Sequence, residues 1–160
     1  MAPNSSTSRS VTGSRLAGVL VLACLVALGV WWARRAAGER SLEAALSVYD
    51  GAPLPTRGAV VDETLADLGA DVFRSRCSAC HAVSGEAKLG PNLAGVTRRR
   101  DLDWIRSMVL RPDSMTANDA VASALKAQYG VQMMVTGEMT PSHVLAVVEF
   151  LRRADGGDGV

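Results

Sequence analysis

Two cysteines and a histidine form the feature that most restricts how this chain can fold. Residues 77–81 read Cys-Ser-Ala-Cys-His, the C-x-x-C-H pattern by which a c-type haem is attached. Cys77 and Cys80 lie three residues apart and share one helix face, so both sulfurs can reach the two vinyl groups of one flat ring. His81 follows directly and is expected beneath the iron as its proximal ligand. The sequence therefore predicts one haem c, covalently attached through the two cysteines.

Two other chemistries use paired cysteines, and both are less well supported here. A thioredoxin-like redox motif requires a βαβ setting, and no convincing strand pattern flanks Cys77. A structural zinc site commonly has four ligands, whereas the remaining Cys and His residues are Cys24, inside an apolar run, and His143. Basic and acidic residues nearly cancel, 17 against 16, so the charge does not suggest a nucleic-acid partner.

An apolar segment near the N-terminus predicts a membrane anchor. Residues 16–33 carry no charge and lie between Arg15 and Arg34. As a helix the segment is about 27 Å long, close to the hydrocarbon thickness of a bilayer. Trp31 and Trp32 end it, where interfacial aromatic residues are common. We therefore expect a single transmembrane helix at residues 16–33, after a short polar tail at residues 1–15.

Two processing signals compete with an uncleaved anchor. Ala27-Leu28-Gly29 places small residues at the interval used by signal peptidase, but cleavage there leaves Val30 and two tryptophans at the new terminus. Val21-Leu22-Ala23-Cys24 loosely resembles a lipoprotein box in which Cys24 is acylated. The residues after Cys24 remain apolar, which disfavours the polar tether of a mature lipoprotein. Both alternatives stay open beside the anchor.

The rest of the chain is predicted to be a linker followed by a helical domain. Residues 34–61 contain several prolines and glycines and are expected to form a semi-extended tether, with a short helix at residues 41–48. Residues 62–155 form the predicted domain, and residues 156–160 a disordered tail. The helices of the domain are expected to begin at Asp62, Asp101, Asn118 and Thr140. The second is expected to end before Pro112 and the third at Gly130.

The motifs of this domain resemble the class I cytochrome c family. The first helix contains Gly69-x-x-x-Phe73-x-x-x-Cys77, and the last helix ends in Phe150-Leu151. In that family these two helices cross. Gly90-Pro91-Asn92-Leu93 is similar to the family's G-P-x-L loop, whose proline carbonyl accepts a hydrogen bond from the haem histidine. The resemblance implies an all-α class I cytochrome c fold, preceded here by one transmembrane helix. It also implies that Pro91 orients His81 and raises its basicity.

The same resemblance assigns a sixth iron ligand and a partner for the haem propionates. Family members place a methionine before the last helix, and alignment puts Met134 there, although Val135 replaces the proline that usually follows. Arg99 aligns with a family arginine near the propionates, which are costly to bury without donors. The ligands that stay open as alternatives to Met134 are Met133, Met139 and His143.

Ligation by histidine and methionine implies an electron carrier. Both axial positions are then filled, so no small-molecule substrate is expected, and the chain is interpreted as an electron-transfer protein rather than an enzyme. A closer resemblance links residues 90–104 and 112–115 (G-P-N-L-x-G-V-x-x-R-R-D-x-x-W, then P-D-x-M) to bacterial cytochromes of denitrification and oxidase-assembly loci. The expected function is a membrane-tethered monohaem cytochrome c that carries single electrons between membrane-bound or periplasmic respiratory partners. The alternatives are a permanent haem c subunit of a respiratory oxidoreductase, such as nitric oxide reductase, and a haem-based redox or gas sensor.

The expected location depends on two opposing signals. Arg9 and Arg15 precede the apolar segment while Arg34, Arg35 and Arg40 follow it, so the positive-inside rule alone mildly favours a cytoplasmic domain. The family resemblance implies haem attachment on the outer side of a bacterial membrane, which outweighs a difference of one charge. We expect a single-pass protein of the bacterial inner membrane with its haem domain in the periplasm.

Overall fold

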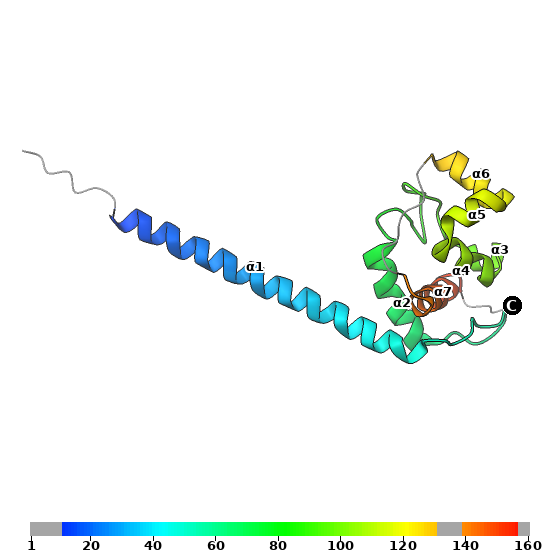
Figure 1. The fold of residues 1–160 in the computed structure, drawn as a ribbon, viewed down its shortest axis with the longest axis horizontal. Coiled ribbons are helices and arrows are strands. Elements are labelled where there is room, and N and C mark those ends of the chain that lie inside the picture. Colours follow the sequence, from blue (N-terminus) through cyan, green and yellow to red (C-terminus); the bar gives the residue numbers. More distant parts are fainter. Residues whose placement is uncertain (1–10, 131–138, 157–160) are drawn as a thin grey trace, which may run out of the picture. The chain divides into compact units, whose positions relative to one another are not determined.

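All regular structure in the described part of the chain is helical. The computed structural model describes residues 11–130 and 139–156 and divides into two units, residues 1–42 and 43–160. The predicted all-α class is confirmed. The helices, in chain order, are α1 (Val11–Leu46), the 3₁₀ turn η1 (Ser47–Tyr49), α2 (Glu63–Arg76), α3 (Val96–Arg99), α4 (Leu102–Leu110), α5 (Pro112–Asn118), α6 (Ala120–Tyr129) and α7 (Pro141–Ala154), and they are labelled in Figure 1.

The first unit consists of most of α1, which is long and apolar enough to cross a membrane. An 18-residue window within residues 18–49 has a mean hydropathy of 1.7, and none of that window is buried inside the protein. The helix does not stop at residue 33. Residues 34–40, expected to be semi-extended, are helical, because this stretch is rich in good helix formers and Arg35 pairs with Glu39 one turn later at 3.5 Å.

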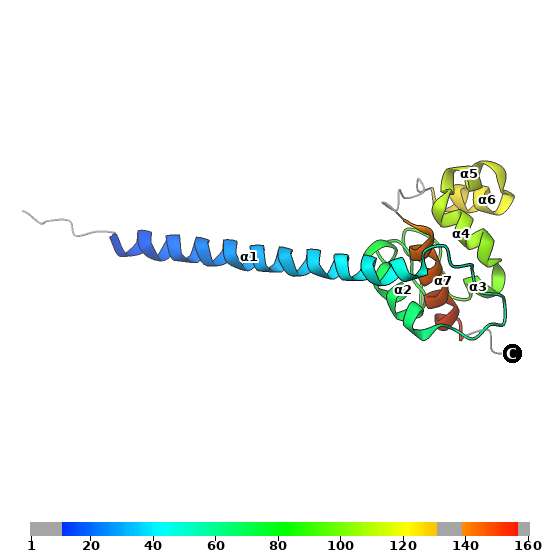
Figure 2. The same cartoon turned by 60° about the horizontal axis from the view of Figure 1, so that its bottom comes forward.

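The core of the second unit forms where α2 crosses α7. Gly69 lies against α7 so closely that an added Cβ would be 1.9 Å from the Ala146 carbonyl oxygen. Beside this contact the rings of Phe73 and Phe150 pack with centroids 5.1 Å apart. Figures 1 and 2 show the green α2 beside the red-brown α7 in both views. The predicted crossing of the first and last domain helices, with glycine at the contact, is confirmed.

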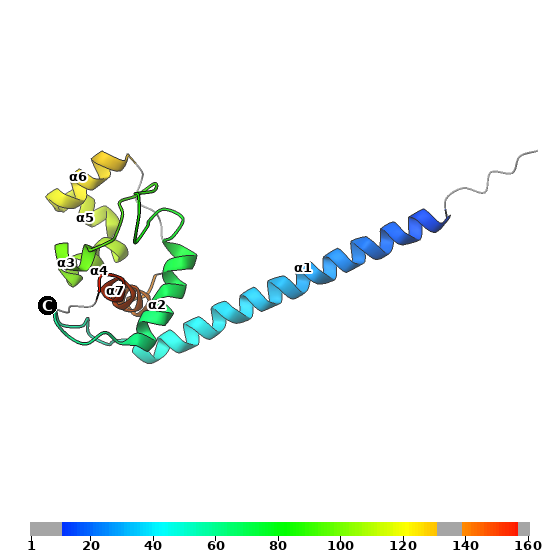
Figure 3. The ribbon, with the colours of Figure 1, turned by 180° about the vertical axis from the view of Figure 1, so that it is seen from behind.

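Helix α7 is the central element of this unit. In Figure 3, as in Figure 1, it lies between α2 on one side and α3 and α4 on the other, and α5 and α6 lie beyond α4. Its core-facing residues are almost completely buried because neighbours cover it on both sides. These residues are Val144, Val147, Val148 and Leu151, each no more than 4% exposed.

Helix boundaries with a strong local signal agree with the sequence. The Asp62 side chain accepts the Leu65 N–H at 2.9 Å and caps α2. Thr140 caps α7 in a reciprocal capping box with His143. Gly130 ends α6 in the left-handed region with φ of 61°.

Two predicted helix starts differ from the structure. Asn118 ends α5 instead of opening the next helix, because Pro112 begins a short helix as well as ending α4, and Asp119 caps α6 through the Ala122 N–H. Asp101 precedes α4 as predicted but makes no capping hydrogen bond. Its carboxylate pairs instead with Arg57 at 2.8 Å.

Candidate functional site

The C-x-x-C-H motif forms a tight turn at the end of α2. Cys77 is the C-cap residue, and its N–H donates to the Phe73 carbonyl at 2.8 Å. The Cys77 carbonyl in turn accepts the N–H groups of Cys80 and His81, at 3.1 and 2.9 Å. The spacing predicts the two cysteines on one helix face, whereas α2 ends at Arg76 and a turn holds them close together beside the histidine.

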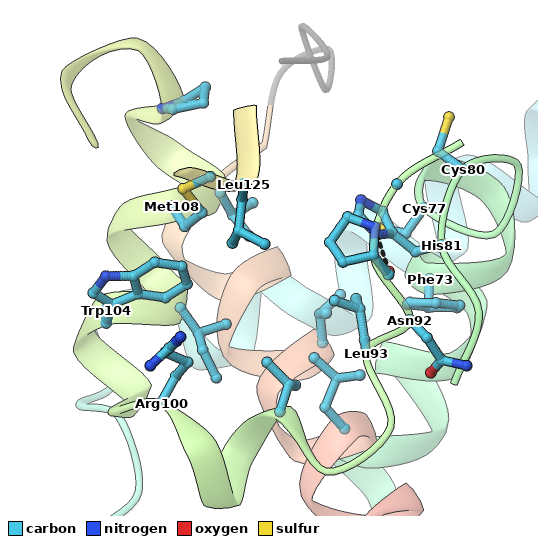
Figure 4. A pocket seen from close by; sticks show the side chains of 18 of the residues that line it. Phe73, Cys77, Cys80, His81, Asn92, Leu93, Arg100, Trp104, Met108 and Leu125 are labelled. Atoms are coloured by element: carbon cyan, nitrogen blue, oxygen red, sulfur yellow. Dashed lines mark hydrogen bonds between the residues drawn. The ribbon is translucent and has the colours of Figure 1, made fainter. Parts of the chain in front are cut away.

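His81 and the cysteines line one wall of a cavity of about 280 Å³. Figure 4 shows His81 with Cys77, Cys80 and Phe73 on one wall, and Met108, Trp104 and Leu125 from α4 and α6 on the other. The lining is mainly apolar and includes residues from α2, α4, α6 and α7. Two thiols and an imidazole on the wall of an apolar cavity suit a flat apolar macrocycle with a central metal, so these residues fit a haem c.

The loop after the motif fixes the orientation of His81. Its Nδ1 lies 2.9 Å from the Pro91 carbonyl oxygen and donates to it, as Figure 4 shows with a dashed line. The ring nitrogen Nε2 is then the one left with a lone pair for a metal. Gly90 presses on the same ring, because an added Cβ would lie only 2.7 Å from His81 Cε1. The Gly90 N–H donates to the Cys80 carbonyl at 2.9 Å, which holds the loop against the motif.

The far end of this loop is fastened by the C-terminus of α7. The Asp155 carboxylate accepts the backbone N–H of Gly95 and both the N–H and hydroxyl of Thr97, the last at 2.6 Å. Arg98 also donates to the Asp155 carbonyl. The cavity wall that carries Pro91 is therefore tied to both long helices of the domain.

Burial dominates the acid–base behaviour of the first cysteine of the motif. Desolvation raises the pKa of the Cys77 thiol to about 11, although the positive charge of Arg76 acts in the opposite direction. The thiol is thus protonated at neutral pH and is not an activated nucleophile of the kind found in dithiol oxidoreductases.

The arginine run places two side chains at the cavity. Arg99 and Arg100 both line it, while the Arg99 guanidinium donates to the Ala94 carbonyl. Arg100 stacks over the Trp104 ring at 5.4 Å from its centroid, and Figure 4 shows the pair together. Trp104 and Arg100 both help to lower the pKa of Asp119, after the larger effect of the hydrogen bond from the Ala122 N–H. The resemblance singles out Arg99, but the structure offers Arg100 at the same wall.

The candidates for the sixth ligand are only partly within the described residues. Met133 and Met134 lie outside them. Met139 is partly buried just before α7. Met108, which sequence reasoning did not consider, lines the cavity opposite His81. His143 does not line the cavity, and its two ring nitrogens contact Thr140 and Glu43.

Several residues that shape the site carry no sequence motif. Asp155 fastens the loop through a contact that spans 58 residues of sequence, and no local pattern predicts such a pair. The contact between Glu43 and His143, which lies outside the cavity, spans 100 residues. Gly90 differs from these two, because it stands inside the G-P-x-L motif, and that motif is the sequence signal for its contact with the His81 ring. Met108 lies within α4, and no motif marks it.

The fold and the site together define a c-type cytochrome. The family model named Cytochrome c matches residues 66–155, and the chain belongs to this family. The family implies a covalently attached haem c, and Cys77 and Cys80, close together in the turn after α2, are cysteines that fit its attachment.

Individual relatives agree with this assignment. Cytochrome c of Tetrahymena pyriformis is 48% identical over 40 residues, which are 25% of this chain and 37% of that protein. A cytochrome c-553-like protein of Synechocystis sp. is 36% identical over 45 residues, 28% of this chain and 43% of that protein. The chain thus matches less than half the length of these curated relatives.

Solved structures match over a longer range. Cytochrome c from Rhodothermus marinus aligns with a TM-score of 0.59 and 31% identity, covering 64% of this chain and 86% of that one. An engineered form of the same cytochrome, bound to a carbene intermediate, aligns with a TM-score of 0.59 and 28% identity, covering 72% of this chain and 99% of that one.

Proposed function

We propose that this chain is a membrane-tethered monohaem cytochrome c that carries single electrons between respiratory partners at the periplasmic face of the bacterial inner membrane. The observation that carries the proposal is the order of its two units. An exposed apolar helix long enough to cross a bilayer precedes a domain that belongs to the cytochrome c family. Tethering confines the search for partners to the membrane surface and raises the effective concentration of the haem domain there.

Within the haem site we propose four roles. His81 binds the iron through Nε2, and Pro91 orients the ring and raises its basicity through the 2.9 Å hydrogen bond to Nδ1. Met134 would supply the second iron ligand, and Arg99 would pair with a propionate of the haem. The bound haem supplies a one-electron couple, and a thioether opposite an imidazole stabilises its reduced state.

The anchor is tested by placing a charge in it. Leu22, 64% exposed on α1, is replaced by arginine in the full chain, expressed in a bacterium that matures c-type cytochromes. An arginine at the centre of a span costs about 2.5–3.5 kcal/mol. Leu22→Arg is therefore expected to move a large share of the haem protein out of the carbonate-washed membrane fraction.

A matched substitution outside the anchor provides the control. Val60 is 93% exposed and lies in the second unit, in the chain segment between η1 and α2, so Val60→Arg adds the same charge with no membrane cost. Val60→Arg is expected to stay in the membrane with the wild type. Equal release of the wild type and both variants from the membrane fraction would reject the anchor. An intact mass that corresponds to a chain beginning at Cys24 would favour lipidation, and one that corresponds to a chain beginning after residue 29 would favour cleavage. Proteolysis of spheroplasts tests the side, because a periplasmic haem domain is digested and a cytoplasmic one is protected.

The sixth ligand and the alternative functions are separated by carbon monoxide binding to the reduced protein. The wild type is expected to bind it slowly, because both axial positions are filled. Met134→Ala is expected to bind it rapidly, whereas Met139→Ala and Met108→Ala behave as the wild type. Rapid binding by the wild type would point to a sensor. Copurification with a larger haem or copper protein in mild detergent would point to a permanent subunit.

A further inference from the structure

The last turn of α1 belongs to the haem-carrying unit, although it precedes the part of the chain that matches the family. The match begins at residue 66, whereas the second unit begins at Glu43. Leu46, in the same helix turn, is completely buried. The Glu43 carboxylate oxygen Oε1 accepts two hydrogen bonds from the domain, one from Arg76 at 3.3 Å and one from His143 at 2.9 Å.

The contact with His143 fixes the carboxylate in place. His143 is 1% exposed, and its Nδ1 accepts from the Thr140 backbone N–H and hydroxyl, at 3.3 and 2.6 Å. With Nδ1 accepting, the ring carries its hydrogen on Nε2 and donates it to Glu43. A buried ring held at both nitrogens has little freedom to turn, so Glu43 is held by a rigid donor at the first turn of α7.

The contact with Arg76 connects the carboxylate to the haem cavity. Arg76 immediately precedes Cys77, and its side chain lines the cavity and is 30% exposed. Its positive charge reaches the attachment motif, because it is the charge that lowers the pKa of Cys77 against the larger effect of burial. Whatever partly neutralises Arg76 therefore changes the electrostatic environment of the cavity.

We propose that Glu43 is a positioning residue of the haem site that holds Arg76 beside the attachment cysteines and offsets its charge, which lowers the reduction potential of the bound haem. The sign follows from the charge added on reduction. A nearby positive charge favours the reduced form, and a negative charge that pairs with it weakens this preference. The inference rests on the attached haem c and does not depend on the proposed anchoring or partners.

The test is the midpoint potential of the purified full-length protein in detergent, measured by spectroelectrochemical titration. Glu43→Gln keeps the side-chain size and an acceptor oxygen but removes the charge. It is expected to raise the midpoint potential, so that the ratio of reduced to oxidised protein at a fixed potential increases about two- to fivefold, the scale of a half-exposed ion pair. Arg76→Gln is expected to lower the potential, and the double variant to return close to the wild type.

Glu39 supplies the matched control. It lies one turn earlier on α1 and pairs with Arg35, so Glu39→Gln removes the same charge without touching the cavity and is expected to leave the potential unchanged. A Glu43→Gln potential equal to that of Glu39→Gln would overturn the proposal, even with a lower unfolding temperature. If Glu43→Gln fails to mature, the midpoint potential of Glu43→Asp is measured instead. The shorter side chain moves the carboxylate away from Arg76, so the potential is still expected to rise, and an unchanged potential would overturn the proposal. A wild-type chain recovered as a soluble protein would contradict the proposed function and leave this shift intact.

Discussion

Replacing Gly69 with alanine is expected to force α2 and α7 apart at the contact on which the domain core depends. An ideal Cβ at Gly69 lies 1.9 Å from the Ala146 carbonyl oxygen, 2.5 Å from its carbonyl carbon and 2.9 Å from Phe150 Cβ. Ordinary contact begins at 3.4 Å, so the two helices must separate by about 1.5 Å. Two of the three obstructing atoms are backbone, which cannot turn away as a flexible side chain does.

The expected loss of stability is large for a single methyl group. Overpacking a core typically costs about 1–3 kcal/mol, and a backbone obstacle places this site at the upper end or beyond. Alanine regains about 1 kcal/mol of helix propensity over glycine. We therefore expect a net loss of about 2–3 kcal/mol in the free energy of unfolding. At about 4 °C per kcal/mol for a domain of this size, the melting temperature falls by about 8–12 °C.

The assay is thermal unfolding of the haem-loaded protein followed by circular dichroism. Gly38→Ala is the control, because Gly38 is also within a helix but nothing lies within 4 Å of its added Cβ. That variant is expected to match the wild type or exceed it slightly. A Gly69→Ala protein that melts within 2 °C of both, on the order of 0.5 kcal/mol by the same conversion, would refute the close crossing of α2 and α7.

Three further substitutions address the haem loop and the charged groups. Gly90→Ala places a Cβ within 2.7 Å of His81 Cε1 and is expected to weaken the hydrogen bond that the ring donates to the Pro91 carbonyl, so the midpoint potential should rise. An unchanged potential would contradict the assigned contact. Burial raises the pKa of Glu149. The stability that the folded protein gains from the protonated side chain is therefore fully present below the ordinary pKa of 4.5 and is lost as pH rises through the raised pKa. Urea unfolding should therefore show the wild-type stability falling relative to Glu149→Gln as pH rises, and a difference independent of pH would count against it. The hydrogen bond from the Ala122 N–H lowers the pKa of Asp119, so the stability that this carboxylate adds is present above pH 3.8 and is lost as pH falls through the lowered pKa. The free energy of unfolding of the wild type should therefore increase relative to that of Asp119→Asn as pH rises. The reverse trend would exclude the cap.

Local chemistry explains what the sequence could predict of this fold. Asp62 and Thr140 mark helix starts because a side-chain oxygen satisfies the free N–H groups of the first turn, and Gly130 marks an end because it takes up a positive φ without strain. The haem motif is equally local, since five consecutive residues carry both the attachment sites and the proximal ligand.

The features that escaped prediction depend on distant parts of the chain. The four-residue α3 is too short to form by propensity alone, and Asp155, 58 residues further on, accepts the Gly95 and Thr97 N–H groups at its start. Glu43 likewise depends on a distant residue. The sequence predicts it as part of the linker, whereas its carboxylate lies 2.9 Å from His143 Nε2, 100 residues further along the chain. Met134 stays a prediction, because it lies outside the described residues.

The intact mass of the protein matured in a competent bacterium is the most direct test of a haem c attached through Cys77 and Cys80. The wild type is expected to exceed its polypeptide mass by one haem that survives denaturation, and a variant with serine at both cysteines is expected to retain none. A wild-type protein with the mass of the bare polypeptide would contradict the account.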